Sequence, residues 1–229
     1  MKTIGLIGGM SWESSAIYYR LINEEVKSRL GGLHSAQCLM YSVDFAEIEY
    51  LMRTNQWEEL AQRLSRVAIN LENAGADFML ICTNTVHKLA EQIQEAISID
   101  LLHIADAAAE AITKKGIKKV ALLGTRATME EDFYKGRLAE KGIEVIIPGE
   151  EDRDTIHHVI FGELCLGRIN PDSRKTYIRI MDELVDRGAK GIILGCTEIP
   201  LLIKAEDAGV PLFDTTYLHA MKAVDKALA

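Results

Sequence analysis

Two segments of this chain place cysteine and threonine side by side directly after an apolar run. Residues 81–87 read Ile-Cys-Thr-Asn-Thr-Val-His after the run 78–81, and residues 194–198 read Leu-Gly-Cys-Thr-Glu after the run 191–194. Each pattern predicts a strand, a polar turn and the start of a helix. Ligands of parallel α/β sheets bind outside the carboxyl ends of the strands. Two such turns in similar halves could therefore bring acid/base groups to opposite faces of one substrate carbon, as inversion of that carbon requires.

The thiol of Cys196 is the first candidate for this chemistry. It follows an apolar strand and precedes a predicted helix, where exposed N–H groups and the helix dipole favour thiolate over thiol. A thiol with a reference pKa of about 8.5 can then act as a base near neutral pH. Cys38 inside a predicted strand and Cys165 on an amphipathic helix are interpreted as packing residues. His87, one helical turn from Thr83, is a secondary candidate that could orient a ligand or a thiol.

Two further turns stand between a predicted strand and a predicted helix. Residues 8–11 read Gly-Gly-Met-Ser and end in Met10 and Ser11; their amides could hold a small carboxylate, or the turn could be structural. The segment lacks the spacing of a dinucleotide-binding loop and the Lys-Ser/Thr of a P-loop, so a nucleotide site is not expected. The turn at residues 124–128 offers the hydroxyls of Thr125 and Thr128, which can cap the next helix or donate to a carboxylate.

Composition restricts the class of protein. The chain has 229 residues, enough for one large domain or two compact ones, and a net charge of −8 with no basic stripe, so nucleic acid and anionic membranes are not expected partners. No apolar stretch approaches the ~20 residues of a membrane span, and no signal peptide is recognisable, which predicts a cytoplasmic protein. The four cysteines are far apart without a C-x-x-C pair, which argues against a metal site and a disulfide framework.

Strands and helices are predicted to alternate along the whole chain. Short apolar runs without alternation are typical of parallel strands that are buried on both faces. Such runs predict strands at residues 3–7, 37–42, 78–81, 101–104, 119–123, 144–147, 191–194 and 211–213. Amphipathic stretches predict helices at residues 14–30, 57–74, 85–96, 105–115, 129–141, 152–167, 171–187 and 218–228. This alternation implies crossover connections and parallel sheets covered by helices.

The two halves of the chain resemble each other. Residues 3–9 are similar to residues 119–125, and the two Cys-Thr turns match as well. We therefore predict an α/β fold of two pseudo-symmetric domains, each a parallel sheet flanked by helices, with the active site in the interdomain cleft. The predicted N-terminal domain spans residues 1–107, with residues 211–229 returning to it, and the second domain spans residues 108–210.

Four of these segments together resemble the aspartate/glutamate racemase family, which needs no pyridoxal phosphate. They are the Gly-Gly-Met turn at residues 8–10, the Asn-Thr-x-His of residues 84–87, the Thr125/Thr128 turn and the Gly-Cys-Thr-Glu of residues 195–198. The resemblance covers essentially the whole chain. It implies no cofactor, a small amino-acid substrate and a homodimer. In the family, two cysteines flank the substrate Cα: one removes its proton as a thiolate and the other delivers a proton to the opposite face.

The chain departs from the family at the first of these cysteines. The family has cysteine directly before Asn-Thr-x-His, where this chain has Thr83, and Cys82 stands one residue earlier. Because consecutive strand residues point to opposite faces, Cys82 turns away from the site in the register that keeps the Asn-Thr match. A rival register would pair Cys82 with Cys196. We prefer the first, which resembles a family subtype with threonine as the first acid/base group and unequal handling of the two enantiomers.

By this resemblance, Thr83 and Cys196 are the catalytic acid/base pair and L-aspartate and L-glutamate are the leading substrates. The residues expected to hold the substrate are Met10, Ser11, Met52, Asn84, Thr85, Thr125, Thr128, Thr197 and Glu198.

A second departure concerns the residues that recognise the distal carboxylate of the substrate. Many family members have an arginine near Met52 or Arg53 and a lysine where Cys165 stands here, so a broader amino-acid range is a second hypothesis. The sequence is also compatible with a related one-cysteine decarboxylase or isomerase, and with a non-enzymatic amino-acid binding protein.

Overall fold

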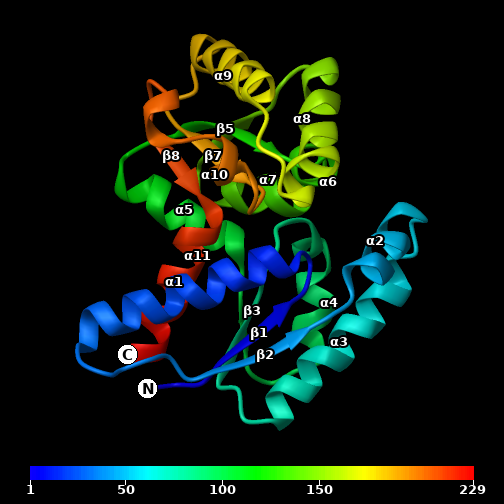
Figure 1. Ribbon diagram of the computed structural model, residues 1–229, viewed down its shortest axis with the longest axis vertical. Coiled ribbons are helices and arrows are strands. Elements are labelled where there is room, and N and C mark those ends of the chain that lie inside the picture. The colour runs from blue at the N-terminus through cyan, green and yellow to red at the C-terminus, as the bar shows by residue number, and fades with distance from the viewer. The chain divides into compact units, whose positions relative to one another are not determined.

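The structure, a computed structural model, describes all residues 1–229. The chain divides into two compact units. Unit 1 contains residues 1–104 and 219–229, and unit 2 contains residues 105–218. Each unit is built on one four-stranded, all-parallel sheet with helices packed against it (Figure 1). The predicted α/β class with two helix-covered parallel sheets is confirmed.

The sheet of unit 1 has the strand order β2-β1-β3-β4. Its strands are β1 (Ile4–Gly8), β2 (Cys38–Ser42), β3 (Phe78–Ile81) and β4 (Asp100–Leu102). Its other elements are α1 (Trp12–Leu30), α2 (Phe45–Arg53), α3 (Trp57–Asn73), the 3₁₀ helix η1 (Thr85–Leu89), α4 (Ala90–Glu95) and most of α11 (Thr215–Leu228).

Helices cover both faces of this sheet. Ile4 and Leu6 of β1 belong to a buried cluster with α1 and α11, whereas Ile7 belongs to a second cluster with α2, α3 and α4. The side chains of β1 therefore alternate between two apolar environments, and every residue of the strand is buried. This is why the strand has no alternation of polar and apolar residues in its sequence.

The sheet of unit 2 has the equivalent order β6-β5-β7-β8. Its strands are β5 (Lys119–Gly124), β6 (Glu144–Ile146), β7 (Ile192–Gly195) and β8 (Leu212–Asp214). Its helices are α5 (Ile104–Lys114), α6 (Arg126–Glu130), α7 (Asp132–Glu140), α8 (Glu150–Gly162), η2 (Leu164–Leu166), α9 (Pro171–Asp186), α10 (Ile199–Leu202) and η3 (Ala205–Asp207). Leu123 and Leu194 pack in one buried cluster with α8 and α9.

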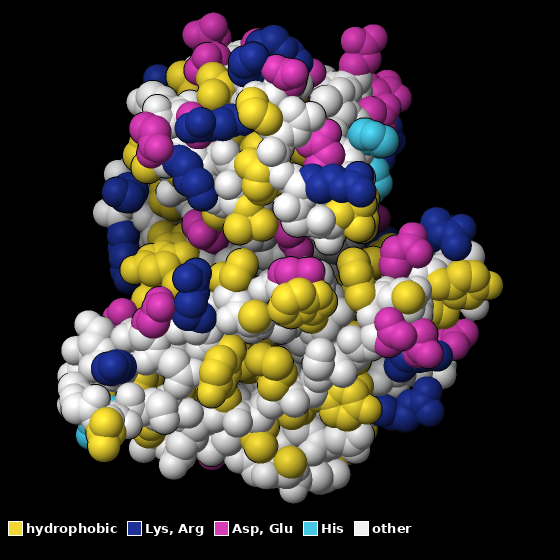
Figure 2. Space-filling model, in the orientation of Figure 1, with side chains coloured by type: hydrophobic (Ala, Val, Ile, Leu, Met, Phe, Trp, Pro, Cys, Tyr) yellow, Lys and Arg dark blue, Asp and Glu magenta, His cyan; other side chains and the backbone are white.

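The surface is mixed in charge. On the face shown in Figure 2, Lys and Arg side chains lie among Asp and Glu side chains. Several of these charges form ion pairs, such as Arg29 with Glu25 at 2.7 Å and Arg179 with Glu183 at 2.6 Å.

No helix combines the length and the apolar composition of a membrane-spanning segment. No group of three or more His, Cys, Asp or Glu side chains is arranged to hold a metal ion.

The turn after β1 requires glycine at position 9. Gly9 has φ +90°, and a Cβ there would lie 2.2 Å from the carbonyl oxygen of Val43. Gly9→Ala should therefore lower the free energy of unfolding by about 3 kcal/mol, because backbone strain and a backbone clash add together. Gly142→Ala is a matched control, since Gly142 has φ +72° with open space around it. It should cost about 1 kcal/mol. Equal losses for both variants in urea denaturation would contradict the clash.

Candidate active site

Polar turns follow two adjacent strands at the carboxyl edge of each sheet. In unit 1, β1 pairs with β3, and the amide of Cys82 donates to the carbonyl of Ile7 at 2.9 Å, so residues 8–11 and 82–85 begin side by side. In unit 2, β5 pairs with β7, so Thr125 and Cys196 follow directly on neighbouring strands. The sequence-predicted site residues are thus gathered at one edge of each sheet, apart from Met52 in α2.

The strand registers make Thr83, rather than Cys82, the counterpart of Cys196. Ile7 pairs with Ile81 in unit 1, and Leu123 pairs with Leu194 in unit 2. Ile7 and Leu123 hold equivalent places, because each directly precedes the glycine that ends its central strand. Ile81 is therefore equivalent to Leu194. Thr83 and Cys196 each lie two residues after this pair and are therefore equivalent. Cys82 and Gly195, one residue after it, are equivalent as well.

Burial separates Cys82 from Thr83. The side chain of Cys82 is 0% exposed and packs in the cluster formed with α1 and α11, and this burial raises the pKa of its thiol. The Ser14 hydroxyl donates to the Cys82 carbonyl at 2.7 Å, which fixes the backbone there. Thr83 is half-buried. Cys82 thus points into the core of unit 1, as the register that retains Asn-Thr predicts.

The thiol of Cys196 lies against the carboxylate of Glu198. The Cys196 thiol donates to Glu198 Oε2 at 2.9 Å, and the Thr197 hydroxyl donates to the same oxygen at 2.7 Å. All three residues are at most 9% exposed. Glu198 is therefore the hydrogen-bond acceptor of the thiol, a contact that the spacing of these residues along the chain does not predict.

The expectation that Cys196 is stabilised as a thiolate is wrong. Burial, and next the negative charge of Glu198, raise the pKa of the Cys196 thiol well above its ordinary value. The predicted helix dipole contributes little, because α10 has only four residues and begins at Ile199. Burial without a nearby cation disfavours the charged form. The resting thiol is therefore protonated near neutral pH.

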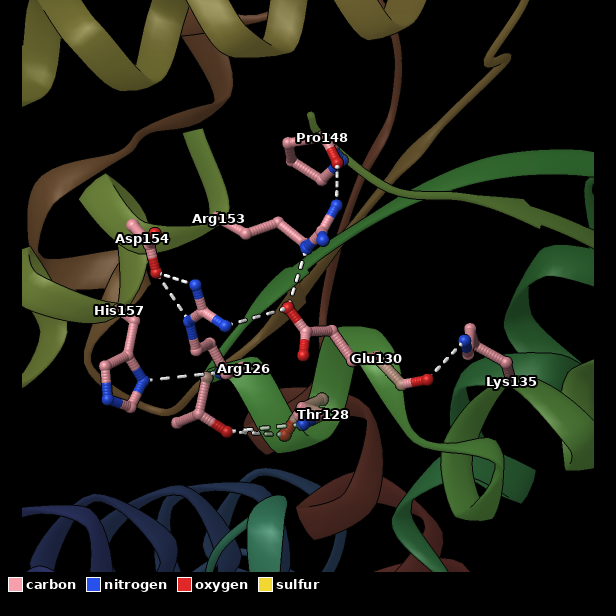
Figure 3. Close-up of polar contacts among 9 residues, drawn as sticks. Arg126, Thr128, Glu130, Lys135, Pro148, Arg153, Asp154 and His157 are labelled. Atoms are coloured by element: carbon pink, nitrogen blue, oxygen red, sulfur yellow. Dashed lines mark hydrogen bonds and ion pairs between the residues drawn. The ribbon is translucent and has the colours of Figure 1, made fainter. Parts of the chain in front are cut away.

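The threonines of the turn after β5 cap a helix. Thr125 is the N-cap of α6: its hydroxyl accepts from the Thr128 amide at 3.3 Å and lies 3.1 Å from the Thr128 hydroxyl (Figure 3). Both side chains are buried. The Thr128 methyl group packs over Gly124 and Gly195, where any Cβ would collide with backbone oxygen. The capping role predicted for this turn is confirmed, and the glycines let Thr128 sit directly on the two strand ends.

The charged side chains around this turn neutralise one another. Arg126 pairs with Asp154 and lies 3.6 Å from Glu130, and Arg153 donates to Glu130 at 2.8 Å (Figure 3). The Arg126 amide donates to Nδ1 of His157 at 3.3 Å. Burial, and next Arg126, lower the pKa of His157, so this ring is a neutral acceptor. Because carboxylates hold the Arg126 guanidinium, the hydroxyls of Thr125 and Thr128 are the groups of this turn that could bind an anion.

The turn after β1 is occupied by internal hydrogen bonds. The Gly9 amide donates to the Ser15 hydroxyl at 2.7 Å, and Ser11 is the N-cap of α1, accepting from the Ser14 amide at 3.3 Å. Met10 is buried in the cluster with α2 and α3. The Gly9 amide thus has a structural role and is not the carboxylate-binding group that was the other interpretation of this turn.

The segment after Thr83 is firmly anchored. Asn84 is buried, Thr85 begins η1, and His87 is buried with its Nδ1 donating to the Thr83 carbonyl at 2.7 Å. His87 was predicted to lie one turn from Thr83, and the structure shows that it holds the Thr83 backbone. The His87 ring is therefore part of the buried structure around Thr83.

The positions expected to recognise a distal carboxylate carry no buried cation. Met52 packs against the cluster formed with α2 and α3. Arg53 is exposed and pairs with Glu49 at 3.3 Å. Cys165 lies in η2 and not on a continuous helix, and it packs against the main core of unit 2.

The spacing of the two lead-ins is a further sequence signal for the Thr83 register. The lead-ins Gly-Ala-Asp at residues 75–77 and Gly-Ala-Lys at residues 188–190 begin 113 residues apart (188 − 75). The separation of Thr83 and Cys196 is also 113 (196 − 83), whereas that of Cys82 and Cys196 is 114 (196 − 82). Aligning the lead-ins instead of the Cys-Thr dipeptides gives the register that the sheets have.

Known proteins are similar to this chain over its full length. Broad specificity amino-acid racemase RacX of Bacillus subtilis (strain 168) is 24% identical over 232 residues, covering 99% of this chain and 98% of RacX. A crystal structure of a candidate Asp/Glu racemase from Yersinia pestis is 56% identical with a TM-score of 0.95, and an aspartate racemase homologue from Pyrococcus horikoshii OT3 is 35% identical with a TM-score of 0.85. Both comparisons cover 100% of each chain.

A family model confirms the resemblance inferred from the motifs. The model described as Asp/Glu/hydantoin racemase matches residues 7–223, which include all four polar turns and every strand except the first residues of β1. Because this match spans nearly the whole sequence, the chain belongs to the Asp/Glu/hydantoin racemase family.

Proposed function

We propose that this chain is a cofactor-independent amino-acid racemase in which Thr83 and Cys196 are the acid/base pair. The observation that carries the proposal is the strand register, which gives Thr83 the place in unit 1 that Cys196 has in unit 2. Family membership supports the reaction class. One group removes the Cα proton of the substrate, and the other delivers a proton to the opposite face, so that the configuration inverts without net gain or loss of protons.

Hydroxyl and amide groups would stabilise the charge that forms after proton removal. Loss of the Cα proton moves negative charge onto the substrate carboxylate, and fixed donors around that charge lower the barrier. We assign this role to Ser11, Asn84, Thr85, Thr125 and Thr128, and to the backbone amide of Thr197, whose hydroxyl already donates to Glu198. The neutralised charges around Thr125 support this assignment, because Arg126 is engaged by Asp154 and Glu130.

The two faces of the substrate would be treated unequally. A thiol can supply or accept a proton within the biological pH range, whereas the hydroxyl of threonine has a far higher pKa and is a weak base. The proposed enzyme therefore processes one enantiomer faster than the other, in line with the subtype that has threonine at the first position.

Aspartate and glutamate are the first substrates to test, as the family name indicates. A second candidate is a broader range of amino acids. The observation that favours it is the uncharged, packed side chains of Met52 and Cys165, where a cation for a distal carboxylate would be expected. The full-length similarity to a broad specificity racemase adds to this candidate.

Chiral chromatography of the purified chain with a panel of L-amino acids tests the proposal. Formation of D-aspartate or D-glutamate without added cofactor is expected, and D-isomers of neutral amino acids as well would favour the broad range. Release of carbon dioxide from a malonate-type acid with no D-amino acid formed would instead indicate a one-cysteine decarboxylase. Binding without any conversion would contradict the enzyme altogether.

Glu198 sets the protonation of Cys196 in this proposal. Glu198→Gln removes the negative charge beside the thiol while retaining an acceptor, so the pKa of Cys196 should fall. Thiolate absorbance titrated against pH, with Cys196→Ser as the blank, measures the change. Proton exchange that needs the thiolate should then rise at lower pH than in the unmodified chain. Glu206→Gln removes the same charge at an exposed position and should leave the titration unchanged. An unshifted titration of Glu198→Gln would contradict this role.

A further inference from the structure

Three buried histidines of unit 1 lie where the chain passes between the units. The chain leaves unit 1 after Ile104 and returns to it at His219. His87 packs against His103 with ring centroids 4.6 Å apart, and against His219 with centroids 5.6 Å apart. All three side chains are buried. One imidazole cluster therefore adjoins both points of passage, and through η1 it adjoins Thr83 as well.

Both ring nitrogens of His87 are held by the backbone. Nδ1 donates to the Thr83 carbonyl at 2.7 Å, and Nε2 accepts from the Ile104 amide at 3.2 Å. A carbonyl can only accept and an amide N–H can only donate, so His87 is the neutral imidazole with its proton on Nδ1. The ring is thus a rigid link between the residue proposed as an acid/base group and the last residue of unit 1 before the chain leaves it.

His219 supports this link from the other point of passage. Its Nε2 donates to the Leu102 carbonyl at 2.9 Å, and its Nδ1 accepts from the Tyr18 hydroxyl at 2.8 Å. Burial, and next His87, lower the pKa of His219 to about 3, so this ring is neutral too. This neutral ring, with both of its nitrogens hydrogen-bonded, packs against the ring of His87.

We infer that His87 is a positioning residue, whose ring fixes the Thr83 backbone relative to the Ile104 amide so that the Thr83 hydroxyl is held in the orientation its proton transfer needs. This inference rests on the proposed function. It predicts that loss of the bond to Thr83 slows proton transfer on the face of the substrate Cα that Thr83 serves. Proton transfer on the face that Cys196 serves should be unaffected. A misplacement of about 1 Å at a catalytic group can cost roughly 100-fold in rate.

Two substitutions separate the bonds of His87. His87→Asn can keep a donor near the Nδ1 position for the Thr83 carbonyl and loses the bond from Ile104, whereas His87→Gln can keep an acceptor for the Ile104 amide and loses the bond to Thr83. His34→Asn is the control, because His34 is exposed. Enantiomer-resolved exchange of Cα protons in D₂O measures each face, and Thr83→Ala identifies the enantiomer that depends on Thr83.

For the enantiomer that depends on Thr83, His87→Gln should slow Cα proton exchange by about 10- to 100-fold. The exchange rate of His87→Asn should stay within about threefold of that of the unmodified chain. Exchange of the other enantiomer should change less than about threefold in both variants. Equal losses for the two enantiomers, or full activity of His87→Gln, would overturn the inference.

Amide hydrogen exchange tests the same link without any substrate. The Ile104 amide should exchange at least about tenfold faster in His87→Asn than in His87→Gln, because only His87→Asn leaves this amide without its acceptor. Equal protection of the Ile104 amide in both variants would overturn the inference. If the unmodified chain exchanges no amino acid, the proposed function fails, and this second measurement still decides whether His87 fixes the backbone.

Discussion

Replacing Cys196 with serine should lower Cα proton exchange by about 1,000-fold or more for the preferred enantiomer. General acid/base groups contribute roughly 10²- to 10⁴-fold, and a serine hydroxyl is a much weaker acid than a thiol. Serine is close to cysteine in volume and can donate to Glu198 as the thiol does, so unit 2 should remain folded. The expected result is thus a loss of rate with an unchanged fold, measured by proton NMR in D₂O together with a thermal unfolding curve.

Cys38→Ser is the matched control for this substitution. Cys38 is a half-buried packing residue of β2, and burial raises the pKa of its thiol to about 11. It carries no role in the proposed reaction, so Cys38→Ser should exchange Cα protons at the rate of the unmodified chain. Full activity of Cys196→Ser would contradict the account, as would equal losses in the two variants.

Substitutions of Thr83 should act on one enantiomer. Thr83→Ala removes the hydroxyl, and exchange of the enantiomer that depends on this face should fall by about 100-fold or more. Exchange on the Cys196 face should persist, because Cys196 can remove a proton and return one to the same face. Thr83→Cys installs a thiol at the position equivalent to Cys196 and should make the two enantiomers more nearly equal in rate.

Cys82→Ala distinguishes the two registers considered for this segment. Because Cys82 packs in the core of unit 1, its replacement should lower stability and leave the ratio of the two enantiomeric exchange rates unchanged. Loss of exchange in Cys82→Ala, with normal exchange in Thr83→Ala, would instead support the register that pairs Cys82 with Cys196.

The strands could be predicted from sequence because each is buried on both faces. β3 (Phe78–Ile81) and β7 (Ile192–Gly195) consist almost entirely of apolar residues, and the structure places them within one residue of the predicted limits. Their parallel pairing followed from the helical stretches between them. The similarity of the two halves predicted two pseudo-symmetric domains, and the two sheets do have equivalent strand orders.

The errors arose where polar contacts set the limits of helices. The predicted helix at 129–141 is two helices, because Glu131 is extended and ends α6. Helix α11 begins at Thr215, three residues before the predicted start, since Asp214 accepts from the amides of Thr216 and Tyr217. Helix α2 (Phe45–Arg53) was not predicted; its nine residues bury Ile48 and Leu51 and are capped by Asp44. These polar contacts form between groups that the fold brings together, so the hydrophobic pattern of the sequence does not reveal them.

The candidate site, too, could be predicted only in part from the sequence. The turns that carry Thr83 and Cys196 could be found from residue types and spacing, but the state of the thiol could not. A position between a strand and a helix suggested a lowered pKa for Cys196, whereas burial and the contact with Glu198 raise it. Spacing along the chain does not reveal burial, and burial is the larger effect here.

Proton NMR of L- and D-amino acids in D₂O, with the purified chain and no added cofactor, tests the central claim most directly. We expect the Cα proton signal of aspartate or glutamate to disappear, faster for one enantiomer than for the other, with the slower process lost selectively in Thr83→Ala and the faster one in Cys196→Ser. Unchanged Cα signals across the whole panel, or exchange that survives both substitutions, would contradict the assignment of Thr83 and Cys196 as the acid/base pair.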